Sequence, residues 1–258
     1  MKMKIMRKRT MRKIFKKKHK LDEEIGLIKN FEGPACENIQ KLQANISFAS
    51  VHDSIKVIGV TSANRSEGKS TTVCNLANIY AEKGKKVCIV NLDIRRPSLY
   101  KILKVKNVVG VVEYVRGEAD LSKVIQHSGK IDVIAAGSKT PFPAKIIQAP
   151  EMKELISILR EKYDYVILDT TPLLAVSDAL YTVPLVDGFL MVCTQHETRK
   201  RTLVAAVELL NHAKANIIGI VMTKVTEYSS GENDGYGYGY YYNSYAETTD
   251  RTKSKNRR

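Results

Sequence analysis

Apolar and polar positions divide most of the chain into two alternating kinds of segment. One kind is a short run dominated by Val, Ile and Leu, which is typical of strands in a parallel sheet covered on both faces. We expect six such strands, at Ile55–Val60, Val87–Leu92, Ile131–Ala135, Tyr165–Asp169, Gly188–Cys193 and Ile217–Met222. The other kind has the apolar spacing of helices, at Thr72–Lys83, Glu151–Lys162, Ser177–Thr182 and Arg199–His212. This alternation predicts an α/β fold with a doubly wound, mostly parallel sheet.

A glycine-containing loop follows the first predicted strand. Gly68, Lys69 and Ser70 lie between that strand and a predicted helix, which is the setting that a P-loop NTPase requires. Backbone N–H groups at the helix start would face phosphates, Lys69 would add a positive charge, and Ser70 would offer a hydroxyl to Mg²⁺. The Walker motif is a deviant one, because Ala63 stands where the usual pattern starts with glycine. The residues expected to bind the nucleotide are Ser62, Ala63, Asn64, Arg65, Ser66, Glu67, Gly68, Lys69, Ser70 and Thr71.

Acidic residues follow two other predicted strands. Asp93 comes directly after the second strand, and Asp169 ends the fourth. The carboxyl ends of parallel strands meet at the ligand-binding edge of an open sheet. Asp is also common at helix N-caps and turns, but two carboxylates at strand ends beside a P-loop favour a magnesium site. We therefore expect Ser70, Asp93 and Asp169 to be the metal ligands.

Length, charge and cysteine content narrow the class of protein. A chain of 258 residues suits one α/β domain with appended tails. Of the net charge of +15, residues 1–20 carry +11 and residues 250–258 carry +4, so the body between them is neutral. This distribution argues against a specific nucleic-acid partner. The four cysteines lack metal-ligand spacing and are expected to be buried free thiols in a reducing cytoplasm.

Composition predicts three segments. Residues 1–32 form a basic segment, which is either an amphipathic helix on an anionic membrane or a solvated tail. Residues 33–227 form the P-loop domain. Residues 228–258 are rich in Gly, Ser, Asn and Tyr without apolar periodicity, which predicts a disordered tail with a basic end. No apolar segment approaches the ~20 residues needed to span a bilayer.

Four features occur in order along the chain: the P-loop, the segment Asn91–Arg95, the segment Tyr163–Thr170 and the tyrosine-rich tail. In these features the chain resembles the bacterial tyrosine kinases of capsule and exopolysaccharide operons, the BY-kinases, from about Gly33 to its C-terminus. The resemblance implies an ATP- and Mg²⁺-dependent protein-tyrosine kinase that phosphorylates the tail of a neighbouring subunit. The implied catalytic residues are Lys69, Asn91, Asp93, Arg95 and Asp169. The implied phosphoacceptors are Tyr236, Tyr238, Tyr240, Tyr241, Tyr242 and Tyr245.

The same resemblance implies partners and a place in the cell. The kinase would form homo-oligomers and respond to a membrane-embedded activator of the polysaccharide chain-length-regulator type. A cognate tyrosine phosphatase would reverse its reaction. It would act in the cytoplasm, at the inner face of the plasma membrane, and regulate capsule or exopolysaccharide biosynthesis.

Asn91 departs from the family pattern, which has an aspartate at that position. An amide cannot accept the proton of a tyrosine hydroxyl, although its carbonyl oxygen can accept a hydrogen bond or bind Mg²⁺. Loss of a general base typically costs ~10²–10⁴-fold in rate. Because phosphoryl transfer depends mainly on positioning and charge neutralisation, we expect reduced activity. In the helix expected over Glu37–Ile46, Gln40 and Gln43 replace arginines that the family uses for ring assembly.

Three alternatives stay open at this point. The first is a catalytically weak or inactive ATP-binding regulator of the polysaccharide machinery, which Asn91 favours. The second is a membrane-associated positioning ATPase, which the absence of that class's signature lysine at Asn64 disfavours. The third is a nucleic-acid-binding ATPase, which rests only on the charged ends of the chain.

Overall fold

The computed structural model describes residues 34–49 and 54–225 of the chain. One unit spans Met1–Thr223, and a second begins at Lys224 and contributes two described residues. The basic segment predicted over residues 1–32 and the tail predicted over residues 228–258, with all six expected phosphoacceptors, lie outside the described residues. The boundaries 33–227 of the P-loop domain stay a prediction.

A seven-stranded sheet with the order β3-β4-β2-β5-β1-β6-β7 forms the centre of the first unit. Its strands are β1 Val57–Ser62, β2 Val87–Asn91, β3 Ile125–Ser128, β4 Ile131–Ile134, β5 Tyr165–Asp169, β6 Gly188–Thr194 and β7 Ile217–Thr223. Neighbouring strands are parallel except for β3 and β4, which form an antiparallel pair. The predicted α/β fold and all six predicted strands are confirmed.

Strand β3 is the one strand that the apolar pattern does not predict. Its four residues, Ile-Gln-His-Ser, form no run of large apolar side chains, and none of them is fully buried. It pairs only with β4, at the edge of the sheet. An edge strand can remain polar because half of its surroundings is solvent, so it leaves no apolar signature in the sequence.

Three longer helices lie where helical spacing predicts them: α3 Lys69–Glu82, α8 Pro150–Lys162 and α9 Lys200–His212. Helix α2 Pro34–Ala49 contains the helix that the family resemblance implies over Glu37–Ile46. The predicted helix at Ser177–Thr182 is a 3₁₀ helix, η1 Ser177–Leu185, which contains Pro184. Proline has no N–H to donate, so it cannot take part in a regular α-helical ladder. The short helices α4 Leu99–Leu103, α5 Val111–Val115, α6 Leu121–Val124 and α7 Pro143–Gln148 were not predicted, because a single turn shows no period.

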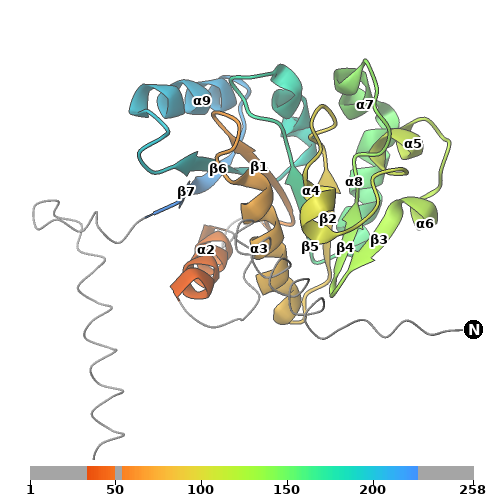
Figure 1. Cartoon of the computed structure of the whole chain (residues 1–258), viewed down its shortest axis with the longest axis horizontal. Coiled ribbons are helices and arrows are strands. Elements are labelled where there is room, and N and C mark those ends of the chain that lie inside the picture. The colour runs from red at the N-terminus through yellow and green to blue at the C-terminus, as the bar shows by residue number, and fades with distance from the viewer. Residues whose placement is uncertain (1–33, 50–53, 226–258) are drawn as a thin grey trace, which may run out of the picture. The chain divides into compact units, whose positions relative to one another are not determined.

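Helices cover both faces of the sheet (Figure 1). Ile89 and Val90 are neighbours in β2 and therefore face opposite sides. Ile89 packs in one buried cluster with Leu76 of α3, while Val90 packs in another with Leu155 of α8. A third cluster joins α9 to β6 at the β6–β7 end. This double covering explains why the strands read as continuous apolar runs.

Two further expectations concern side chains of the core and of α2. All four cysteines are free and buried, as predicted. Gln43 of α2 accepts a hydrogen bond from Lys83 at the end of α3, so its side chain is used within the subunit. Among the described helices, none is long and apolar enough to cross a membrane.

Candidate nucleotide-binding site

The loop between β1 and α3 has the backbone of a phosphate-binding loop. Gly68 adopts φ 91°, in the left-handed region, and α3 begins at the next residue. A Cβ atom at Gly68 would also lie 3.1 Å from Cγ2 of Thr223. Glycine is therefore favoured here both by the backbone angle and by the close neighbour. The start of an α-helix in this position is a suitable site for an anion, because its first N–H groups point along the helix axis toward the ligand.

Ala63 is accommodated where the usual pattern has glycine. Its methyl group is completely buried, in the apolar cluster that includes Leu173, Phe189 and Met191. The left-handed residues of the loop are Ser66, with φ 63°, and Gly68, and Ala63 is not among them. The deviant first position therefore has no conformational need for glycine and gains apolar packing instead.

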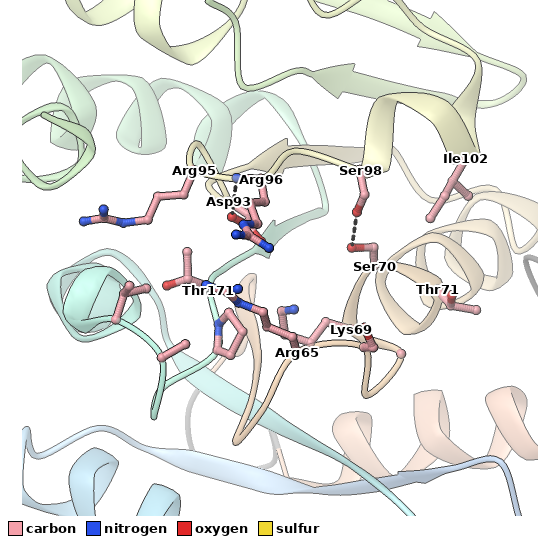
Figure 2. A pocket seen from close by; sticks show the side chains of 15 residues that line it. Arg65, Lys69, Ser70, Thr71, Asp93, Arg95, Arg96, Ser98, Ile102 and Thr171 are labelled. Atoms are coloured by element: carbon pink, nitrogen blue, oxygen red, sulfur yellow. Dashed lines mark hydrogen bonds between the residues drawn. The ribbon is translucent and has the colours of Figure 1, made fainter. Parts of the chain in front are cut away.

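A cavity of about 380 Å³ opens at the carboxyl ends of the strands, within the range of small-molecule sites (Figure 2). It is bounded by the P-loop, the loop after β2 and the loop after β5. Its lining residues are Arg65, Ser66, Gly68, Lys69, Ser70, Thr71, Asp93, Arg95, Arg96, Ser98, Ile102, Thr171, Pro172, Ala175 and Val176. Of the ten loop residues expected to bind nucleotide, those not in the lining are Ser62, Ala63, Asn64 and Glu67.

Ser70 and Asp169 meet at the base of this site. The Ser70 hydroxyl donates to Asp169 Oδ2 at 2.7 Å. Asp169 is only 1% exposed, and its Oδ1 atom has no hydrogen-bond partner among the described residues. Burial raises the pKa of Asp169 to about 6, and the nearby charge of Lys69 opposes that rise. A buried carboxylate oxygen without a partner, beside a serine hydroxyl, is a suitable ligand for Mg²⁺ or for its water.

Asn91 ends β2 and pairs with Asp169 of β5, and Asp93 lies two residues beyond it. Asn91 is fully buried; its Oδ1 accepts the backbone N–H of Asp93 at 3.1 Å, and its Nδ2 has no partner among the described residues. Asp93 is half-buried and accepts the backbone N–H of Arg96 at 3.1 Å. Burial raises the pKa of Asp93, and Lys69 again lowers it. Asn91 thus uses its carbonyl oxygen within the turn and presents its amide nitrogen as a donor.

Arg95 is held by an ion pair at the edge of the cavity. It donates to both carboxylate oxygens of Asp178, at 2.5 Å and 3.0 Å, and Asp178 is 1% exposed. In Figure 2 the Arg95 side chain extends away from Ser70 and Ser98. Its charge is therefore compensated by η1. Asp178 carries no motif signal in the sequence, so this partner could not have been predicted.

Of the predicted catalytic and metal-binding residues, Lys69, Ser70, Asp93 and Arg95 line the cavity, whereas Asp169 and Asn91 are buried next to it and do not. The loop after β5 was expected at this edge of the sheet, but Arg96, Ser98 and Thr171 were not predicted as individual site residues. Their positions shortly after the ends of β2 and β5 are the one sequence signal that could have revealed them.

Comparison with known proteins assigns the family. A family model described as "ParA: NUBPL iron-transfer P-loop NTPase" matches residues 53–241, which confirms the P-loop NTPase fold. Over 209 residues the chain is 34% identical to the tyrosine-protein kinase YwqD of Bacillus subtilis, covering 80% of this chain and 85% of that protein. The chain belongs to the bacterial tyrosine kinases. The resemblance found in the sequence is therefore confirmed at the level of the family.

Solved structures agree with this family assignment. The kinase domain of the Escherichia coli tyrosine kinase ETK superposes with a TM-score of 0.70 at 32% identity, covering 76% of this chain and 80% of that one. This chain matches only 27% of the length of the whole E. coli tyrosine-protein kinase etk. The septum site-determining protein MinD of Pyrococcus horikoshii, solved with MgADP, shares the fold at a TM-score of 0.54 and 22% identity, over 69% of this chain and 73% of that one. A magnesium nucleotide is thus bound by another protein with this fold.

Proposed function

We propose that this chain is a protein-tyrosine kinase that uses ATP and Mg²⁺. The observation that carries the proposal is the cavity lined by Lys69, Ser70 and Asp93, whose Ser70 is hydrogen-bonded to the buried Asp169. This arrangement supplies a cation for phosphates and oxygen ligands for a hard metal in one place. Membership of the tyrosine-kinase family supports tyrosine as the acceptor.

The described residues fit a magnesium nucleotide. Lys69 would contact the β- and γ-phosphates, and the N–H groups at the start of α3 would bind their oxygens. Ser70, Asp93 and Asp169 would hold Mg²⁺ and its waters. When bound, the metal would neutralise charge on the phosphate oxygens. The unpartnered Oδ1 of Asp169 supports this assignment, since a buried acceptor needs a ligand or water to satisfy it.

The site would lack a free carboxylate to receive the proton of the tyrosine hydroxyl, because Asn91 stands at that position and Asp93 would hold Mg²⁺. Asn91 cannot accept that proton, and its carbonyl oxygen already accepts the N–H of Asp93. The loose transition state of phosphoryl transfer depends little on a base. We therefore expect activity below that of a site with a carboxylate at position 91.

The acceptors would be the tail tyrosines of a second copy of the chain: Tyr236, Tyr238, Tyr240, Tyr241, Tyr242 and Tyr245. A mixing experiment tests this assignment. One protein carries phenylalanine at all six positions with an intact P-loop, and the other carries Lys69→Ala with an intact tail. We expect phosphotyrosine on the Lys69→Ala protein only in the mixture with ATP and Mg²⁺. No phosphotyrosine in the mixture, with strong signal in the wild type, would exclude transfer between copies.

A non-catalytic ATP-binding regulator is the second candidate function. The buried Asn91 favours it, because a donor amide stands where the reaction would use a carboxylate. Both candidates bind nucleotide, so phosphotyrosine formation separates them.

We further propose that a membrane-embedded chain-length regulator activates the kinase and that a cognate phosphatase reverses its reaction. The kinase would form homo-oligomers, lie at the inner face of the plasma membrane and act in capsule or exopolysaccharide biosynthesis. Arg95 would contact the transition state or a neighbouring subunit only after leaving Asp178.

A further inference from the structure

Glu67 is a P-loop residue whose carboxylate is buried. It is 3% exposed and does not line the cavity. Its two oxygens accept hydrogen bonds from the backbone N–H of Asn64 at 2.8 Å, the Asn64 side-chain amide at 3.1 Å and the Thr198 hydroxyl at 2.6 Å. All three donors are neutral. The carboxylate thus closes the turn from Asn64 to Glu67 and joins it to the segment after β6.

The backbone of Glu67 is anchored as firmly as its side chain. Its carbonyl oxygen accepts the hydroxyl of Thr223, the last residue of β7, at 2.8 Å. Thr198, which holds the side chain, itself accepts the backbone N–H of Thr194 at 2.8 Å. The same Thr223 packs against Gly68. Hydrogen bonds through Thr198 and Thr223 therefore connect the P-loop to the ends of both β6 and β7.

These hydrogen bonds lie on either side of Ser66, the loop residue with a strained backbone conformation. Ser66, immediately before Glu67, is a non-glycine residue with φ 63°. Such a conformation costs about 1–2 kcal/mol for an L-residue, and it persists where its surroundings determine it. The turn closed by Glu67 onto Asn64 contains Ser66. The bonds of Glu67 therefore act on the residue whose conformation sets the shape of the loop.

Electrostatics alone would disfavour a carboxylate at this position. Glu67 belongs to a loop that would hold a polyphosphate, two residues before Lys69. Its negative charge would repel the negative charges of the phosphates. Burial of a carboxylate without a cationic partner adds a further cost. Glutamine in its place could not accept hydrogen bonds at both Asn64 and Thr198 through two oxygens. The observed geometry uses both oxygens of the carboxylate.

We propose that Glu67 is a positioning residue that holds the P-loop in its phosphate-binding shape by bonding it to the ends of β6 and β7. The inference rests on the proposed function only in requiring that a magnesium nucleotide binds at this loop. If Glu67 acted only through its charge, Glu67→Gln would change the affinity for nucleotide in the opposite direction from the change expected of a positioning residue. Removal of the negative charge alone strengthens nucleotide binding, whereas loss of the positioning bonds weakens it.

Binding of MgADP by the full chain, measured by titration calorimetry, tests the proposal. Loss of a hydrogen-bond acceptor for a buried donor predicts about 10-fold weaker binding for Glu67→Gln. The matched control is Glu113→Gln, because Glu113 is 7% exposed and accepts the N–H groups of Gly110 at 2.8 Å and Ser138 at 3.0 Å, away from the cavity. The control variant should lose stability and keep the wild-type affinity.

Thr198→Val supplies a second variant should Glu67→Gln fail to fold. It removes one donor to Glu67 and keeps the bonds to Asn64, so we expect a smaller loss of MgADP affinity. The double variant should lose less than the sum of the two single losses, because both act on one network. Unchanged or tighter binding in Glu67→Gln, or in Thr198→Val if only that variant folds, overturns the inference. A wild-type chain that binds no MgADP overturns the proposed function as well.

Discussion

At the scale of single residues, the site contains buried polar groups whose burial lowers the stability of the folded protein. Asp169 is an acid buried at the end of β5, where its second oxygen has no partner among the described residues. Asn91, its neighbour across the sheet, likewise leaves an amide nitrogen unpaired within the described structure. Unsatisfied buried polar atoms are costly. Each of the two side chains is hydrogen-bonded to a residue that lines the cavity, Asp169 to Ser70 and Asn91 to Asp93, although neither lines it itself.

The pKa of Asp169 predicts a stability cost that depends on pH. The folded-state pKa is raised from 3.8 to about 6, so the folded protein holds a proton that the unfolded chain releases between these values. Stability therefore falls as pH rises through this window. Asp169→Asn should raise the free energy of unfolding at neutral pH on the order of 2 kcal/mol in the absence of Mg²⁺ and nucleotide. Urea unfolding at several pH values measures this.

The gain in Asp169→Asn should shrink as the pH falls below 6, because the wild-type acid is then protonated. The same variant should lose Mg²⁺-dependent nucleotide binding, since a carboxylate ligand is gone. A gain that is equal at all pH values would contradict the role of the buried charge.

At the scale of elements, the loop after β2 is tied to η1 by Arg95 and Asp178. Arg95→Ala leaves a carboxylate that is 1% exposed without its cation. Breaking a buried pair costs about 3–5 kcal/mol, but Arg95 is 42% exposed, so we expect about 1–2 kcal/mol. The midpoint of urea unfolding should fall accordingly. It should recover in part in the double variant with Asp178→Asn, which no longer carries the unpaired charge.

Arg116→Ala is the control for this prediction. Arg116 pairs with Glu118 at 3.9 Å, and both side chains are well exposed. Surface pairs of this kind contribute about 0–1 kcal/mol. Equal effects of Arg95→Ala and Arg116→Ala would show that the connection between the loop and η1 adds no stability.

At the scale of the whole molecule, the sequence predicts the strands, the helices and the P-loop better than it predicts the side-chain contacts between distant segments. Apolar runs such as Val87–Leu92 reveal buried strands, and glycine beside lysine and serine reveals the P-loop, because each has one dominant physical requirement. The polar edge strand β3 has no such requirement. The pairing of Arg95 with Asp178 and the bonds of Glu67 to Thr198 depend on segments far apart in the chain, which only the folded structure brings together.

The charge distribution of the chain makes a separate prediction for membrane binding. Residues 1–20 carry +11 on a chain whose body is neutral. Basic residues near an anionic bilayer contribute about 1 kcal/mol each, and salt screens them. The full chain should sediment with vesicles that contain phosphatidylserine and remain free of neutral vesicles. Binding that survives deletion of residues 1–32 would assign the attraction to another part of the chain.

The most direct test of the account compares phosphotyrosine formation in the wild type, Lys69→Ala and Asn91→Asp with ATP and Mg²⁺. For a kinase with this site we expect signal in the wild type, none in Lys69→Ala, and a faster reaction in Asn91→Asp by up to ~10²-fold, since a carboxylate base is restored. A silent wild type beside an active Asn91→Asp would contradict the proposed kinase activity and establish a regulator with a disarmed site.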